Sequence, residues 1–125
     1  MRNTLRVNVT AALALTGVLW AMAPDSPVAD AAMRGDVESV RSLLKHGADV
    51  NAAQGDGMSA LHWAAVNGDV KTAEILIYAG AGVDAHTRLG SYTPLHLASR
   101  EGHAEVLKSL LDAGVDVNAL TSTGG

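Results

Sequence analysis

The chain repeats itself at a spacing of 33 to 34 residues, and this spacing limits the possible folds more than any other feature. The segments Ser26-Pro27-Val28-Ala29, Ser59-Ala60-Leu61-His62 and Thr93-Pro94-Leu95-His96 align with one another. A first glycine follows each start by nine residues and a second one twelve residues later: Gly35 and Gly47, Gly68 and Gly80, Gly102 and Gly114. The one extra residue lies between Gly90 and Thr93, so it is a loop insertion. Such a period indicates a stack of similar supersecondary units.

Each unit predicts two short helices. Ser26, Ser59 and Thr93 are expected N-caps whose hydroxyls accept from backbone N–H groups. Proline fits the first helical position that follows Ser26 and Thr93. The first helices are predicted at residues 27–34, 60–67 and 94–101. A second helix follows the first glycine, and the second glycine ends it. Its apolar residues recur at spacings of three and four: Val37, Val40, Leu43 and Leu44; Val70, Ala73, Leu76 and Ile77; Val106, Leu107, Leu110 and Leu111.

These helices are too short to be stable alone, so neighbouring units must bury their apolar faces. The composition agrees, because 48% of the residues are hydrophobic but only 3% are aromatic. A core of Ala, Val and Leu predicts thin, closely stacked elements. Small residues recur where helices would approach closely: Ala31, Ala32, Ala64, Ala65 and Ala98.

The residues Thr93-Pro94-Leu95-His96-Leu97-Ala98, Ser59-Ala60-Leu61-His62-Trp63-Ala64-Ala65 and Gly47-Ala48-Asp49-Val50-Asn51-Ala52 resemble the ankyrin repeat. The resemblance covers about residues 26 to 120. It implies an all-α solenoid of stacked helix-turn-helix units with protruding β-hairpin-like loops. The expected repeats are residues 24–53, cap-like, then 54–86 and 87–120, and residues 121–125 match the opening of a further, truncated repeat. We therefore expect a fragment of a longer protein or a natural truncation.

Residues 1–23 predict a signal peptide. Arg2 and Arg6 precede the uncharged segment from Val9 to Ala23, which ends in the small-x-small pattern Ala21-Met22-Ala23. As a helix this segment would reach about 22 Å, short of the ~30 Å hydrocarbon core of a bilayer. We expect export to the periplasm or secretion; an uncleaved membrane anchor is the alternative. The net charge of −4 argues against nucleic acid and against anionic membrane surfaces as partners.

The sequence predicts no catalytic residue, metal site or cofactor. It contains no cysteine, and no two histidines have the i,i+4 spacing of a helical metal site. A calcium-like loop beginning at Asp49 has Ala53 where a ligand is needed. The resemblance implies that His62 and His96 bond the cap hydroxyl and the backbone of the adjoining loop. Trp63 is expected to be half buried against the next unit.

The loop tips and the solvent side of each first helix form one continuous strip in a stacked solenoid. By resemblance, these positions contact partners. The predicted contact surface consists of Asp56, Met58, Val66, Asn67, His86, Arg88, Leu89, Tyr92, Arg100 and Glu101. Its centre is expected at Met58, Arg88, Leu89 and Tyr92, whose residue types often anchor interfaces. Solvated loops with a shielding role are the alternative.

We expect a non-catalytic scaffold that binds a protein partner, whose identity the sequence does not specify. One alternative is a regulatory or anchoring repeat segment at the front of a longer exported enzyme. Another is end-to-end self-association through the uncapped face of the last unit.

Overall fold

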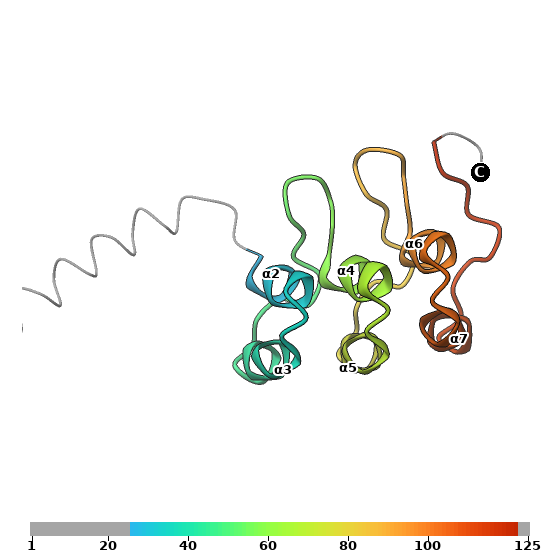
Figure 1. Cartoon of the computed structure of the whole chain (residues 1–125). Coiled ribbons are helices and arrows are strands. Elements are labelled where there is room, and N and C mark those ends of the chain that lie inside the picture. The colour runs from blue at the N-terminus through green and yellow to red at the C-terminus, as the bar shows by residue number, and fades with distance from the viewer. Residues whose placement is uncertain (1–25, 123–125) are drawn as a thin grey trace, which may run out of the picture.

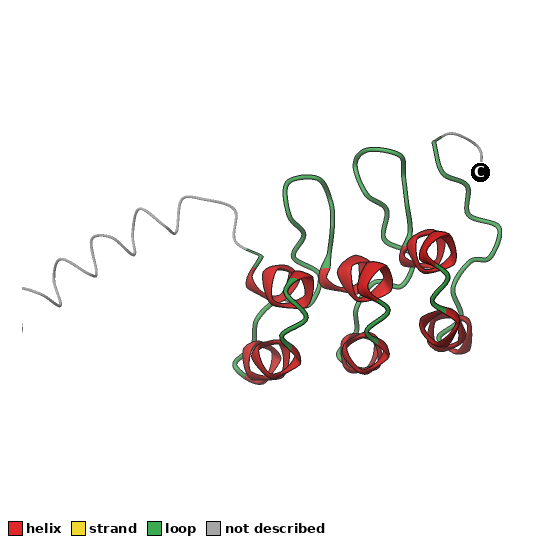
Figure 2. Cartoon of the chain, in the orientation of Figure 1, coloured by secondary structure: helices red, strands yellow, loops and turns green. Residues whose placement is uncertain are grey.

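A computed structural model describes residues 26–122, and these form three helical hairpins in a row (Figure 1). The first hairpin pairs α2 (Pro27–Met33) with α3 (Val37–Lys45), and the second pairs α4 (Ala60–Asn67) with α5 (Val70–Tyr78). The third pairs α6 (Pro94–Glu101) with α7 (Ala104–Asp112). The described region is all-α, since it contains helices and loops but no strand (Figure 2). The predicted stack of helix-turn-helix units is confirmed.

The hairpins place α2, α4 and α6 in an inner row and α3, α5 and α7 in an outer row (Figure 1). Three loops, at residues 46–59, 79–93 and 113–122, rise on the side of the inner helices that faces away from the outer ones. In each of the first two, a backbone bond closes the tip: Gln54 N donates to Met58 O at 3.0 Å, and Thr87 N donates to Tyr92 O at 2.9 Å. The loops are therefore hairpin-like without forming a ladder.

Polar side chains begin the helices as the sequence predicts, with one exception. Ser59 and Thr93 have extended backbones, and their hydroxyls accept from the third helical N–H. Ser26 occupies the N-cap position but makes no such bond, so the hydroxyl bond predicted there is wrong. Its ψ is 59°, compared with 172° for Ser59. The hydroxyl is therefore not placed over the first turn.

The same first helix is also one residue shorter than predicted, because Arg34 caps α2 instead of belonging to it.

The outer helices end in a recurring six-residue bonding pattern. Ala48 N donates to Leu43 O at 3.0 Å, and Gly47 N donates to Leu44 O at 3.1 Å. Residues 76–81 and 110–115 repeat this arrangement. It satisfies carbonyls that a helix end otherwise leaves unpaired, and it directs each chain segment out into the next loop.

The core lies between the hairpins and consists mainly of small aliphatic side chains. Ala31, Ala64, Ala65 and Ala98 are fully buried, as are the larger Leu61, Leu76 and Leu110. Alanine at the inner helices lets neighbouring backbones approach closely, and the inner helices contact one another more extensively than the outer ones do. The inner row is therefore the tightly packed side of the stack.

The predicted signal peptide at residues 1–23 and the last three residues lie outside the described part of the chain. Between residues 26 and 122, no helix combines the length and apolarity needed to cross a bilayer.

Candidate functional site

Two histidines fix the loops to the repeats that precede them. Nδ1 of His62 accepts a hydrogen bond from the backbone N–H of Ser59 at 3.1 Å, and its Nε2 lies 2.9 Å from the carbonyl oxygen of Tyr92. A backbone N–H can only donate, so Nδ1 is unprotonated and Nε2–H donates to Tyr92. His96 makes the corresponding contacts with Thr93 N at 3.0 Å and Ala119 O at 2.8 Å. The structural role predicted for both rings is confirmed.

The His62 ring is fully buried, and this burial lowers the pKa of His62 below its usual value of 6.5. Hydrogen bonding to the Tyr92 carbonyl opposes that effect, but desolvation is the larger cause. The neutral ring is the form that matches its partners, since a proton on Nδ1 would face the Ser59 N–H. The ring is a buried connector between two repeats.

Neighbouring loops are bonded to each other near their tips. The backbone N–H of Arg88 donates to Asp56 O at 2.9 Å, and the Arg88 guanidinium donates to Gly55 O at 3.2 Å. The approach is so close that a Cβ atom at Gly57 would lie 2.8 Å from Arg88 N. The second and third loops are joined in the same region by Ser122 N and Gly90 O at 2.8 Å. The tips therefore form one connected edge.

A second row of bonds joins the loops at their bases. The Asn51 side-chain oxygen accepts from Gly82 N at 2.7 Å, and one repeat later the Asp84 carboxylate accepts from Asp116 N at 2.9 Å. The donor is a backbone N–H in both cases. This explains why glycine at position 82 can stand where the third repeat has Asp116.

Trp63 is partly buried, as predicted. Its indole N–H donates to the Gln54 side-chain oxygen at 2.9 Å, on the side of the preceding repeat and not of the next unit, where the contact was expected. The Gln54 amide nitrogen in turn donates to the Asp30 carboxylate at 2.8 Å. Three residues from the first loop, α2 and α4 thus form one chain of hydrogen bonds. The polar end of Trp63 is therefore engaged within the protein.

The Tyr92 ring lies beside the exposed side of α6. The Arg100 guanidinium carbon is 5.4 Å from the centre of this ring, within cation–π range. His96 meets the same ring edge to face, with centroids 6.4 Å apart. Arg100 also pairs with Glu101 at 3.4 Å. The loop and the helix thus share one aromatic and charged cluster.

Most of the predicted contact surface is accessible to solvent, but its residues differ in how far they are exposed and in the bonds they make within the protein. The exposed members are Asp56, Asn67, His86, Arg88, Leu89, Arg100 and Glu101, and the partly buried ones are Met58, Val66 and Tyr92. The Asn67 amide donates to Ala32 O at 3.1 Å, and Val66 O lies 3.0 Å from His103 Nε2. These two residues of α4 therefore help to hold adjacent repeats together. Leu89, in contrast, is 81% exposed.

Two exposed apolar residues extend the same strip beyond the predicted contact surface. Met33 on α2 is 43% exposed and occupies the slot of Val66 and Arg100 in its repeat. Leu120 is 66% exposed and occupies the slot of His86. The repeat register identifies both positions when it is applied to the first repeat and to the last loop.

Between residues 26 and 122, no group of three or more histidine or acidic side chains lies close enough to hold a metal ion. Several polar side chains on the strip instead bond to the protein's own backbone, as those of Asp56, Asn67 and Arg88 do. The arrangement suits recognition by shape, charge and apolar contact.

Stacked helical hairpins with bonded, protruding loops define a solenoid repeat protein. The chain belongs to the ankyrin repeat family: the model for three copies of the ankyrin repeat matches residues 28–121. Repeats of this family serve as protein-interaction scaffolds.

Several known proteins contain similar repeats. The chain is 36% identical over 89 residues to palmitoyltransferase Hip14 of Drosophila melanogaster, and the matched segment covers 71% of this chain and 14% of that protein. It is 37% identical over 99 residues to human ankyrin repeat and SOCS box protein 3, and here the matched segment covers 77% of this chain and 19% of that protein. The chain thus spans less than a fifth of the length of these relatives.

Proposed function

We propose that the protein is a non-catalytic scaffold that binds a protein partner through the loop tips and the exposed side of the inner helices. The observation that carries this proposal is the pair of bonds from Arg88 to the first loop, which join the tips before any partner arrives. Loops ordered in advance lose little conformational entropy on binding. More of the interaction energy with the partner is then available for affinity.

The centre of the proposed surface lies at Leu89, Tyr92 and Arg100. Leu89 presents an apolar side chain that makes no contribution to the core, being 81% exposed. Tyr92 and Arg100 already contact each other, so an aromatic face and a positive charge are offered together. Tyr and Arg are the residue types that most often dominate interface energies.

Affinity capture with the full chain, followed by titration calorimetry of the captured protein, tests this proposal. Leu89→Ser and Arg100→Ala are each expected to weaken the partner's Kd by about ten-fold. Leu111→Ser is the matched control, because Leu111 is also an exposed leucine but lies on α7. Equal affinity of the wild type and both surface variants would contradict the proposal. Tyr92 and Arg88 suit this test less well, since both hold neighbouring parts of the protein.

Export of the protein is part of the same proposal. It is supported by the basic start, the uncharged segment and the Ala21-Met22-Ala23 pattern of the sequence. Cell fractionation followed by mass spectrometry of the native polypeptide tests it. A mature protein outside the cytoplasm that lacks residues 1–23 is the expected result, whereas a full-length cytoplasmic protein would contradict it.

A second candidate function is that the repeats are a regulatory or anchoring segment of a longer enzyme. The match to a palmitoyltransferase favours it, because the repeats cover only 14% of that protein. The intact mass of the native polypeptide separates the two candidates. A much larger mass, with an activity that depends on Leu89 and Arg100, would favour the enzyme.

A further inference from the structure

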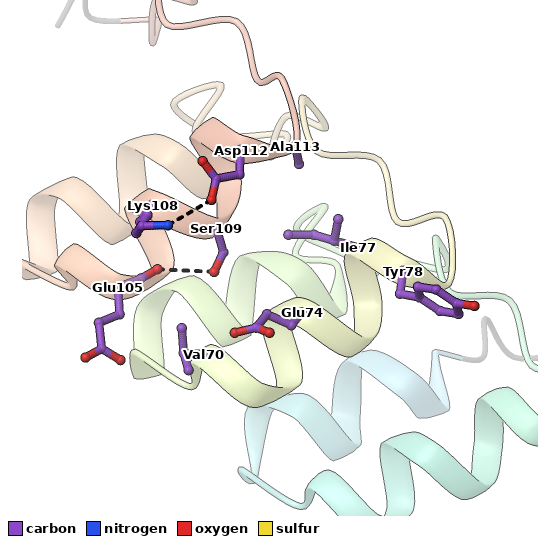
Figure 3. A pocket seen from close by; sticks show the side chains of 9 residues that line it. All are labelled: Val70, Glu74, Ile77, Tyr78, Glu105, Lys108, Ser109, Asp112 and Ala113. Carbon is purple, nitrogen blue, oxygen red and sulfur yellow. Dashed lines mark hydrogen bonds and ion pairs between the residues drawn. The ribbon is translucent and has the colours of Figure 1, made fainter.

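The outer helices α5 and α7 border a groove of about 700 Å³ on the side of the molecule opposite the loops (Figure 3). The inner helices pack closely through alanines, whereas the outer helices contact one another less extensively. A wedge therefore opens between α5 and α7. Its volume lies within the roughly 300–1,000 Å³ typical of ligand-binding pockets.

The α5 wall of the groove is apolar at both ends. Val70 and Ile77 are partly buried, and both pack against the core. Tyr78, the last residue of α5, is 96% exposed, and Figure 3 shows its ring projecting from the end of the helix. A ring with this exposure contributes almost no burial to folding. It is available for contact with another molecule.

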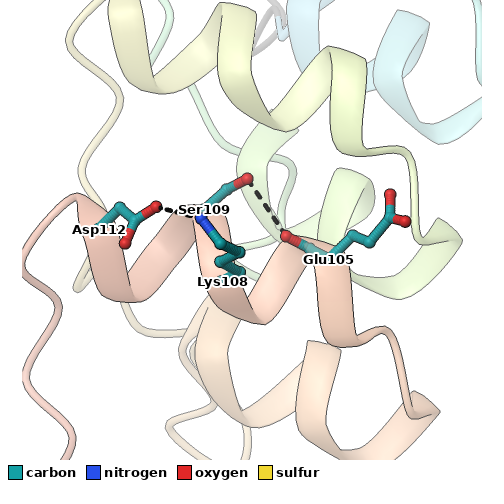
Figure 4. Close-up of polar contacts among 4 residues, drawn as sticks. All are labelled: Glu105, Lys108, Ser109 and Asp112. Carbon is teal, nitrogen blue, oxygen red and sulfur yellow. Dashed lines mark hydrogen bonds and ion pairs between the residues drawn. The ribbon is translucent and has the colours of Figure 1, made fainter.

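The polar groups of the groove are mostly acidic. Three carboxylates line it, from Glu74, Glu105 and Asp112, against the single ammonium group of Lys108. Lys108 is paired with Asp112 at 3.1 Å, and the Ser109 hydroxyl donates to the backbone oxygen of Glu105 at 3.2 Å (Figure 4). Within the described residues, the carboxylates of Glu74 and Glu105 have no cationic partner. Two negative charges therefore remain uncompensated beside an apolar wall.

We propose that this groove docks a basic segment of a protein partner, with an Arg or Lys side chain between Glu74 and Glu105. The aliphatic stem of such a side chain would lie along Val70 while its charged end stays near the carboxylates, and Ile77, at the other end of the wall, would meet an apolar residue of the same segment. Tyr78 offers an aromatic face for a second cation. A second copy of this chain fits poorly, because the chain carries a net charge of −4. The groove faces away from the loops, so a scaffold with both surfaces can hold two partners at once.

Fluorescence anisotropy with two labelled hexapeptides tests the proposal on the full chain. One peptide alternates leucine with arginine, and the other alternates leucine with citrulline, which has nearly the same shape without the charge. The arginine peptide is expected to bind at least ten-fold more tightly. Glu74→Gln and Glu105→Gln are each expected to weaken it about three-fold. Tyr78→Phe should retain binding that Tyr78→Ala reduces.

Glu38→Gln is the matched control, because Glu38 occupies in α3 the position that Glu105 occupies in α7. It changes the net charge equally but lies outside the groove, so binding should be unaffected. Equal loss in Glu38→Gln and Glu105→Gln would overturn the proposal, since the peptide would then respond only to net charge. Equal binding of both peptides, or no binding of either, would also overturn it. So would a concentration-dependent dimer that Glu74→Gln dissociates, because the occupant would then be a second copy.

Discussion

His62 of the second repeat and Tyr92 of the third are joined by a hydrogen bond of 2.9 Å between Nε2 and the carbonyl oxygen. The side chain of the same residue, Tyr92, contacts the Arg100 guanidinium through its ring. The buried His62 ring is therefore bonded to a residue at the centre of the proposed partner-binding surface. The stability of the stack and the shape of its binding surface depend on the same contact.

Stability is expected to fall below about pH 6.5 because the pKa of His62 is lowered by burial in the folded state. The unfolded chain then binds the proton more readily, so the contribution of the neutral ring is fully present above pH 6.5 and is lost as the pH falls through the folded-state pKa. Urea unfolding at a series of pH values measures this. His62→Ala should be less stable at neutral pH by about 2–4 kcal/mol and should show a shallower acid slope. An unchanged slope in His62→Ala would contradict the assignment.

Gly57→Ala is expected to destabilise the protein by about 2–4 kcal/mol. Its φ is +86°, which disfavours any side chain, and the added Cβ would lie 2.8 Å from the backbone nitrogen of Arg88. Gly55→Ala is the control two residues away, where a Cβ meets nothing within 4 Å. It should change stability by less than about 0.5 kcal/mol. Similar unfolding curves for the two variants would mean that the loops do not approach each other as described.

Gly68→Ala and Gly35→Ala separate backbone strain from contact between repeats. Their φ values are nearly equal, +67° and +70°, but only at Gly68 would a Cβ collide, at 2.5 Å from the His103 ring. Gly35→Ala should cost about 1–2 kcal/mol from the left-handed backbone alone, and Gly68→Ala should cost more. His103→Ala should bring the two costs closer in a double-mutant cycle. Equal costs with and without His103 would argue against this packing.

Gln54→Ala is expected to cost about 1 kcal/mol and to shift the emission of Trp63, because the indole N–H loses its acceptor. The measurement uses a Trp20→Phe background so that Trp63 is the remaining tryptophan. Gln54→Glu keeps the acceptor but places a carboxylate against Asp30, which Gln54 now contacts at 2.8 Å. It should therefore leave the emission closer to wild type while lowering stability more at neutral pH. Identical spectra for all three proteins would contradict the bond.

The resemblance to the ankyrin repeat implies the roles of His62 and His96, whereas the repeat register predicts the helices, because these depend on local spacing. It fails at Ser26, where a cap-like sequence has a different backbone angle from Ser59. The bond from Arg88 N to Asp56 O could not be predicted, because it joins two backbone groups, which nearly every residue type has. Gln54 was missed for another reason: its partners, Trp63 and Asp30, become neighbours only when the repeats stack.

The groove between α5 and α7 also depends on stacking. From the sequence alone, Glu74 and Glu105 are expected only to be solvent-exposed, because each lies on the polar side of an amphipathic helix. They line one groove only because α5 and α7 become neighbours when the repeats stack. The sequence therefore predicts the helices of each repeat better than the surfaces that form between stacked repeats.

Backbone ¹⁵N relaxation of the free protein at Asp56, Gly57 and Arg88 tests most directly whether the loops are ordered before binding. Since Arg88 N is bonded to Asp56 O at 2.9 Å, we predict order parameters near 0.85 at these residues, as in the helices. Values below about 0.6 in the free protein would contradict the account, because the loops would then be flexible and would have to become ordered on the partner.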